Sequence, residues 1–104
     1  MRLIERQMNA AISNCKSWKC ANTEVSTEND GVSVVYLHGH RIAEIGDDFV
    51  QLFDGGHQTA TTKSRLNAIL SAHGAGERIF SKNFEWFVIV NGEKVPFTNG
   101  MELR

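Results

Sequence analysis

The chain has 104 residues, with 11 Lys and Arg residues against 12 Asp and Glu residues, so its formal net charge is −1. This length fits a single domain over residues 1–104, and a hydrophobic fraction of 41% excludes an intrinsically disordered chain. The near-neutral charge excludes a strongly basic nucleic-acid coat and a strongly acidic DNA mimic.

The first residues contain no long apolar run, and no stretch approaches the ~20 apolar residues of a membrane span. We therefore expect no signal peptide and no membrane partner. Cys15 and Cys20 are the only two cysteines, which indicates reduced thiols in a cytoplasm.

Residues 3–18 are predicted to form an amphipathic helix, because apolar residues recur there at helical spacing. Glu5 and Asn9 fall off this apolar stripe, and Trp18 closes it at the helix end. The stripe consists of Leu3, Ile4, Met8, Ala11, Ile12 and Cys15.

The following segment changes to the patterns typical of strands, with β-branched and aromatic residues in its central run. Gly39 and His40 are expected to form a two-residue hairpin loop, since such loops often need positive φ at both positions. The predicted strands are 22–27 at an edge, 32–38 in the centre, 41–45 and 49–53.

Residues 61–73 return to helical spacing, and we expect a helix over about 62–73. Thr61 or Thr62 is the expected N-cap, because a hydroxyl there can accept a hydrogen bond from a first-turn N–H. Gly74 is expected to end the helix in a left-handed conformation.

The run 84–90 is the most apolar in the chain and predicts a sheet-centre strand covered on both faces. Asn91-Gly92 is a strong type I′ hairpin signal, and Asn99-Gly100 predicts a second such turn before a short tail strand. Pro96 places the strand over 93–97 at a sheet edge.

This order of elements indicates the α+β class. We expect an N-terminal helix, an antiparallel sheet of about five to seven strands, and the second helix packed on that sheet.

Two motifs carry a resemblance to a known family. Leu37-His38-Gly39 precedes His40, and a helix start follows that contains Thr59, Thr61, Thr62, Arg65, Leu66 and Asn67. These motifs resemble a family of small tailed-bacteriophage proteins with a Leu-His-Gly-Asn hairpin and a Thr-x-Thr-Thr-x-x-Arg-Leu-Asn helix start. His40 stands where Asn is usual, and His57 where Trp is usual. The resemblance implies a phage origin and carries no mechanism.

The start of the second helix is a candidate site for an anion or a partner. A Gly turn precedes it, and free N–H groups with the helix dipole favour negative charge there. The alternative is an ordinary threonine cap with solvated cations. The candidate residues are Thr59, Thr61, Thr62, Lys63, Arg65, Arg41 and His57, with the hairpin residues His38, Gly39 and His40 beside them.

The cysteines and histidines are also potential metal ligands, but four residues separate Cys15 from Cys20, at the outer edge of zinc-site spacing. No local signature supports a Cys nucleophile with a His base. We therefore expect no metal, no cofactor and no catalytic residue, with one cysteine buried in the helix stripe.

Phe84, Trp86 and Phe87, with Lys82 and Arg78, could stack nucleic-acid bases beside cations. Burial on both faces of a central strand is the simpler interpretation. Charge is also distributed unevenly: residues 22–54 hold seven acidic residues and one basic residue, whereas residues 55–82 hold four basic residues and one acidic residue. Such regions can steer a partner.

We expect a small non-enzymatic phage accessory protein that binds a host or phage protein in the bacterial host cytoplasm, for example to inhibit a host process during host takeover. The alternative is a nucleic-acid-binding module that uses the basic start of the second helix. Zinc binding and catalysis are least favoured. The edge near Pro96 leaves a homodimer open.

Overall fold

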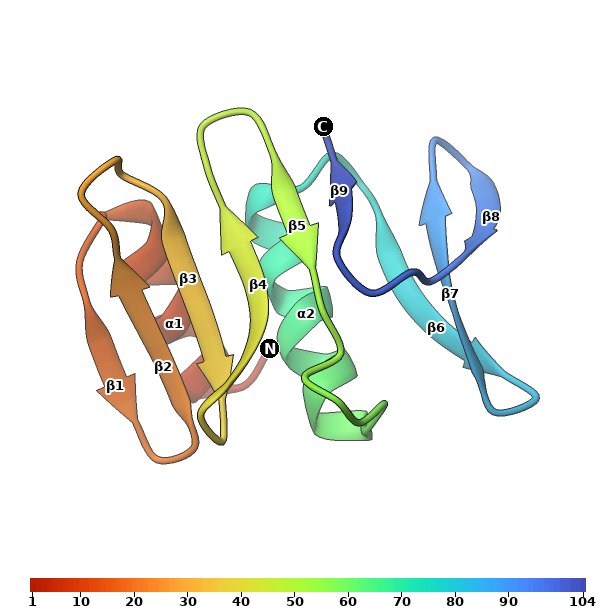
Figure 1. Ribbon diagram of the computed structural model, residues 1–104, viewed down its shortest axis with the longest axis horizontal. Coiled ribbons are helices and arrows are strands. Elements are labelled where there is room, and N and C mark those ends of the chain that lie inside the picture. The colour runs from red at the N-terminus through yellow and green to blue at the C-terminus, as the bar shows by residue number, and fades with distance from the viewer.

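Two helices and nine strands make up the computed structural model, which describes residues 1–104 (Figure 1). This content confirms the α+β class. The elements are α1 (Leu3–Ser13), β1 (Trp18–Cys20), β2 (Thr23–Thr27), β3 (Ser33–Leu37), β4 (His40–Ile45), β5 (Val50–Leu52), α2 (Ala60–His73), β6 (Arg78–Lys82), β7 (Glu85–Val90), β8 (Glu93–Pro96) and β9 (Met101–Leu103).

The strands divide into two antiparallel sheets, where the sequence pattern suggested one. The first sheet has six strands in the order β1-β2-β3-β4-β5-β9, which is within the expected size. The second has three strands in the order β6-β7-β8. The chain leaves α2, completes the second sheet, and returns to the first, where β9 pairs with β5. The two edge strands of the first sheet are β9 and β1, so β2, the strand predicted at an edge over residues 22–27, lies inside the sheet.

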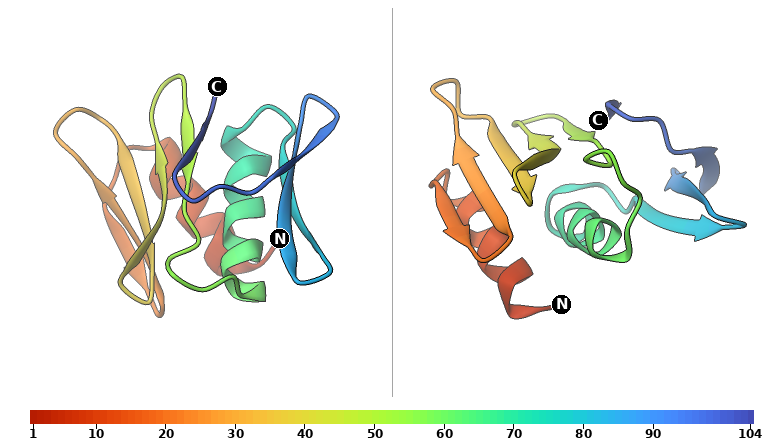
Figure 2. Two further views of the ribbon diagram at one scale, coloured as in Figure 1. Left: turned by 45° about the vertical axis from the view of Figure 1, so that its right-hand side comes forward. Right: turned by 60° about the horizontal axis from the view of Figure 1, so that its bottom comes forward.

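Helix α2 lies between the two sheets, whereas α1 packs beside it against the β1–β2 end (Figure 2). One hydrophobic core runs through all these layers: Met8, Leu52, Leu66, Ile69 and Val88 are each 0% exposed. Because α2 has neighbours on opposite sides, its buried residues extend well beyond a single stripe. Neither helix is long and apolar enough to cross a membrane.

Helix α1 ends earlier than predicted, at Ser13 instead of residue 18. Cys15 adopts a left-handed conformation with φ 51°, and the Lys16 N–H donates to the Ala11 carbonyl at 3.0 Å. The Cys15 N–H donates to the Ile12 carbonyl at 3.2 Å, which completes a Schellman C-cap. Glycine is the usual residue at this position after a helix, so the residue types around Cys15 gave no sign that the helix ends here. Both cysteines are exposed, and the expectation of a buried one is wrong.

The β3–β4 hairpin turns one residue earlier than predicted. His38 and Gly39 both have positive φ, 52° and 78°, and His40 already belongs to β4 opposite Leu37. The pairing shifts between Val35 and Tyr36, where β4 contains one extra residue. The bulge therefore lets the neighbouring residues Ile42 and Ala43 both be buried.

The ends of α2 also differ from expectation. Thr59 is the N-cap, because its Oγ1 accepts a hydrogen bond from the Thr62 N–H at 3.1 Å, so the helix starts before Thr61. Gly74 ends the helix with extended backbone, φ −89°, not with a left-handed conformation. Space explains the glycine: a Cβ there would lie 2.6 Å from Glu77 Oε1 and 2.7 Å from the Leu70 carbonyl oxygen.

Strand β7 is central in the second sheet, but only one of its faces is well covered. Trp86 and Val88 are buried, whereas Phe87 is half-exposed and Phe84 lies in the preceding turn, fully exposed. The expectation of burial on both faces is therefore wrong. Within the sheet, β7 pairs with β6 on one side and with β8 on the other. β8 carries Pro96 and forms the predicted edge strand.

The two Asn-Gly turns differ. Asn91 and Gly92 both have positive φ, which confirms the type I′ hairpin between β7 and β8. In the second turn only Gly100 has positive φ, and the Met101 N–H donates to the Thr98 carbonyl at 2.9 Å. This second turn is therefore not of type I′.

A buried ion pair joins the two helices. Arg65 Nη1 of α2 donates to Glu5 Oε2 of α1 at 2.9 Å, and both side chains are 4% exposed. Ser64 Oγ donates to the same carboxylate oxygen at 2.6 Å, and Arg65 Nε donates to Thr23 Oγ1 of β2 at 3.0 Å. Glu5 was expected off the buried stripe. It lies inside because Arg65 supplies the opposite charge there.

Burial by itself raises the pKa of Glu5. Hydrogen bonds from the Ser64 and Arg65 side chains and the Arg2 backbone N–H, with the Arg65 charge, lower it by more, so the net pKa lies below its usual range. A depressed carboxyl pKa stabilises the fold above the unfolded-state value near 4.5, and this contribution is lost as pH falls through the folded-state pKa.

Glu5→Gln should lower the free energy of unfolding by about 3 kcal/mol, because it leaves the Arg65 charge buried without a counter-charge. Urea denaturation at pH 7 measures this loss. Glu28→Gln, at an exposed position, should change stability by less than about 0.5 kcal/mol. The double variant Glu5→Leu, Arg65→Met should recover most of the loss. Equal stability of Glu5→Gln and the wild type would contradict a structural role.

Candidate functional site

The predicted site at the start of α2 is partly interior. Arg65 and Thr62 are 3% and 4% exposed, and Arg65 is bound by Glu5, so neither side chain is available to a partner. Thr59 caps the helix, and Thr61 and Lys63 are only partly exposed. The helix start therefore retains one accessible cation of the two expected.

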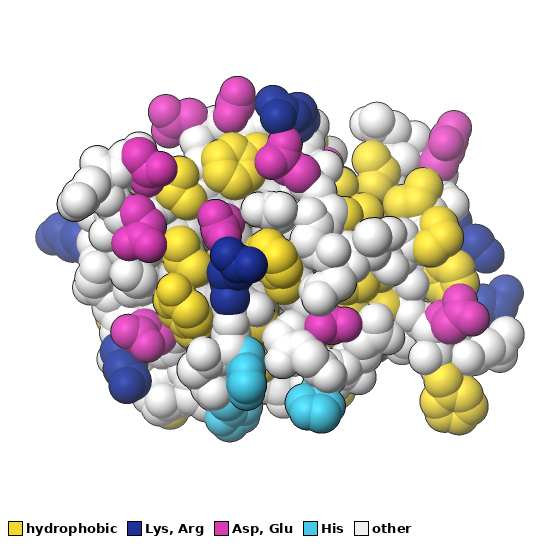
Figure 3. All heavy atoms as spheres, viewed as in Figure 1, with side chains coloured by type: hydrophobic (Ala, Val, Ile, Leu, Met, Phe, Trp, Pro, Cys, Tyr) yellow, Lys and Arg dark blue, Asp and Glu magenta, His cyan; other side chains and the backbone are white.

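Arg41 lies on β4 and is occupied within the chain. Its guanidinium pairs with Glu44 at 2.7 Å and stands 4.2 Å from the centre of the Phe53 ring. Acidic side chains are spread around this part of the molecule in the view of Figure 3. The acidic residues of segment 22–54 thus belong to the first sheet and its loops.

The β3–β4 hairpin and the segment before α2 lie side by side in the structure, although the two sequence motifs give no sign of this contact. His38 and His40 from the β3–β4 turn, with His57 from the segment after β5, line one cleft of about 220 Å³ together with Asp54 and Thr61. Histidine side chains gather at the lower edge of the molecule in Figure 3. The cysteines do not join them, and no group of three or more His, Cys, Asp or Glu side chains is placed to hold a metal ion.

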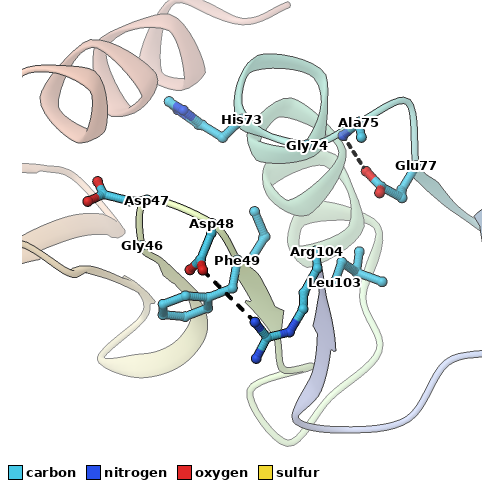
Figure 4. Close-up of a pocket in the computed structure, with 11 residues that line it drawn as sticks. Gly46, Asp47, Asp48, Phe49, His73, Gly74, Ala75, Glu77, Leu103 and Arg104 are labelled. Atoms are coloured by element: carbon cyan, nitrogen blue, oxygen red, sulfur yellow. Dashed lines mark hydrogen bonds and ion pairs between the residues drawn. The ribbon is translucent and has the colours of Figure 1, made fainter.

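A second cleft, of about 180 Å³, lies at the carboxyl end of α2 (Figure 4). The β4–β5 loop, the end of α2 and the C-terminal residues line it. Two of its ionic groups have contacts within the chain: Glu77 accepts a hydrogen bond from the Ala75 N–H at 2.6 Å, and Arg104 stands 4.0 Å from Asp48. The Arg104–Asp48 contact is exposed at 70% and 81%, so it contributes little to stability.

His73, the last residue of α2, lines this cleft. Its ring points from α2 toward α1, away from Glu77 (Figure 4), and its buried Nε2 has no hydrogen-bond partner. Burial lowers the pKa of the imidazole below its ordinary value of 6.5. The neutral ring is therefore the form that fits the fold.

Folding stability should consequently decrease as pH falls below about 6.5, since the unfolded chain takes up this proton before the folded chain does. Urea midpoints at pH 7.5, 6.0 and 5.0 test this prediction. His73→Leu should flatten the decrease over that range, whereas His57→Leu, at an exposed site, should not. Parallel pH profiles for the wild type and His73→Leu would contradict the prediction.

A third cleft brings together two features that the sequence presents separately, the basic helix start and the aromatic strand. It measures about 250 Å³ and lies between the start of α2 and the β6–β7 hairpin. Lys63 Nζ donates to Ser81 Oγ of β6 at 2.9 Å across this cleft. The cleft is lined by Gln58, Thr59, Ala60, Lys63, Ser81, Phe84 and Trp86.

Phe84 stands at the tip of the β6–β7 hairpin beside this cleft. Asn83 and Phe84 both have positive φ, 54° and 65°, and a bulky side chain rarely adopts this conformation. The Phe84 side chain is fully exposed at 103%, and a hydrophobic side chain projects from this end of the molecule in Figure 3. Trp86, two residues later, is buried and meets the edge of the Phe97 ring at a centroid distance of 5.2 Å.

One signal in the sequence could have located this turn: Asn83, directly before Phe84, is a common turn residue. The apolar run 84–90 obscured this signal, because it placed Phe84 inside the strand. We define the tip surface as Phe84 with the cleft residues Lys63, Ser81, Gln58 and Thr59.

A comparison with protein families matches the whole chain, residues 1–104, to the family described as Kyanoviridae Gp96 protein. No curated protein and no solved structure matches the chain.

Proposed function

Because the chain belongs to the Kyanoviridae Gp96 protein family, a cyanophage family, we propose that it is a small non-enzymatic accessory protein that binds a host or phage protein through the tip surface. Its place of action in this proposal is the host cytoplasm, and inhibition of a host process is one form that the binding could take.

Exposure of Phe84 is the observation that carries the proposal. A fully exposed Phe side chain gains about 1.5–3 kcal/mol when a partner removes it from water. Its left-handed backbone places that side chain beyond the end of the sheet, where the fold itself makes no use of it. Backbone strain of this kind is concentrated at sites of function.

The cleft beside Phe84 indicates the chemistry of the partner segment. Lys63 Nζ is bound only to the neutral Ser81 hydroxyl, so its charge is available. A carboxylate that enters the cleft would meet this ammonium group near the positive end of the α2 dipole. We therefore propose a partner segment in which an apolar side chain packs on Phe84 and an acidic side chain reaches Lys63.

Nucleic-acid binding at the start of the second helix has less support, because Arg65 is buried and paired with Glu5. One accessible Lys neutralises too little phosphate charge for useful affinity. A second copy of the chain is the other candidate for the tip surface, and it becomes an outcome of the test.

Phe84→Ala should leave thermal stability within about 0.5 kcal/mol of the wild type and should weaken partner binding about 30-fold, as expected for a central apolar contact of ~2 kcal/mol. Tagged wild-type protein is incubated with lysate of infected host cells, and the bound proteins are quantified by mass spectrometry. Affinity for the recovered protein is then measured with purified components.

Leu3→Ala is the matched control, since it removes a different exposed apolar side chain, 61% exposed on α1. It should bind the partner like the wild type, and Lys63→Glu should bind less. Equal recovery by wild type and Phe84→Ala, or recovery of no specific protein by the wild type, would contradict the proposal. If the pure wild-type protein forms a dimer that dissociates on dilution, and Phe84→Ala is monomeric, the tip surface would be assigned to self-association.

A further inference from the structure

The outer face of the second sheet is separate from the tip surface, and its composition follows from strand register. Directly paired residues of an antiparallel sheet share a face. One face therefore carries Ile79, Val88 and Val95 in one row, and this is the face that packs toward α2. The opposite face carries three rows, Arg78-Ile89-Lys94, Phe80-Phe87-Pro96 and Lys82-Glu85.

Two aromatic rings occupy the middle row of this outer face. Phe80 and Phe87 lie side by side on paired strands, with ring centroids 5.7 Å apart and an interplanar angle of 27°. Both residues remain half-exposed, because no helix or strand covers this side of the sheet (Figure 2). The two rings form a small stacked platform on the hydrogen-bonded strand pair β6–β7.

Cations lie on both sides of the platform. Arg78 and Lys94 belong to the row on one side, and Lys82 belongs to the row on the other. Lys94 Nζ lies 4.7 Å from the centre of the Phe87 ring. All three cations are exposed, and none forms a salt bridge, unlike Arg41, Arg65 and Arg104.

We propose that this outer face binds single-stranded nucleic acid. An unpaired base stacks on the Phe80–Phe87 platform, and the flanking phosphates contact Arg78 and Lys94 on one side and Lys82 on the other. Stacking on aromatic rings with nearby cations is the general means by which sheet surfaces hold single strands, and it tolerates any base. A duplex cannot use the platform, because its bases are already stacked and paired.

The charge pattern favours nucleic acid over an apolar peptide as the occupant. Glu85 is the one acidic residue in the three rows, against three cations. The overall charge of −1 does not oppose binding here, because the acidic excess belongs to the first sheet on the other side of α2. Three phosphate contacts are few, so the binding is expected to be weak and strongly dependent on salt.

Fluorescence anisotropy of labelled dT12 with the full chain tests the proposal. Between 50 and 200 mM NaCl the affinity should fall about 20-fold, as three released counterions require for a single strand. A duplex of the same length should bind at least about tenfold more weakly than dT12, because only the single strand stacks.

Phe87→Leu keeps an apolar side chain but removes the aromatic plane, and it should weaken dT12 binding about tenfold. The double variant Lys82→Gln, Lys94→Gln changes only exposed side chains, so it keeps the test valid if Phe87→Leu unfolds, and it should reduce the salt dependence. Lys19→Gln, an exposed cation on β1, is the matched control and should bind like the wild type.

The proposal would be overturned if the wild type did not bind dT12 at 50 mM NaCl, or if its affinity were the same at 50 and 200 mM NaCl. Equal binding of single strand and duplex, or unchanged binding by the Lys82, Lys94 double variant, would overturn it as well. Phe84→Ala should bind dT12 normally, so the failure of one proposed surface leaves the other intact.

Discussion

The Glu5–Arg65 ion pair is the interaction on which the arrangement of layers depends. Helix α2 separates the two sheets, and an arginine on its buried side needs a counter-charge. Glu5 of α1 supplies that charge, while Thr23 at the start of β2 accepts a further hydrogen bond from Arg65. The pair and its hydrogen bond to Thr23 therefore fix the positions of α1, α2 and β2 relative to one another. Desolvation makes such a pair costly to form, but removal of one member costs more.

The position of α2 in turn decides where the second sheet presents its exposed features. β6, β7 and β8 attach to the molecule mainly through the inner face that packs on α2. Their outer face consequently remains uncovered, and Phe84 at the hairpin tip stays fully exposed beside the start of α2. The Asn67 side chain reinforces the attachment, since it both donates to and accepts from the backbone of Ile79 at 2.9 and 2.7 Å. These two hydrogen bonds and the buried inner face fix the position of the second sheet against α2.

Local signals in the sequence were reliable where one residue controls the backbone. Asn91-Gly92 produced the expected hairpin, and Pro96 lies on the expected edge strand. They failed where an unusual residue takes a glycine's place: Cys15 ends α1 in a Schellman motif, and Phe84 sits in a left-handed turn. In both cases the residue type indicated the neighbouring element, and only the backbone conformation shows that the element has ended or not yet begun.

Sequence patterns were enough to predict the α+β class, both helices in outline and most strands, and they singled out Lys63 and the aromatic run as candidates. Tertiary structure decided that Lys63 and Phe84 share a cleft, that Phe80 and Phe87 face solvent together, and that Arg65 lies inside. The physical reason is that burial and charge pairing depend on residues far apart in the chain. Arg65 and Glu5 are 60 positions apart, and no local pattern around either one shows that the two will meet.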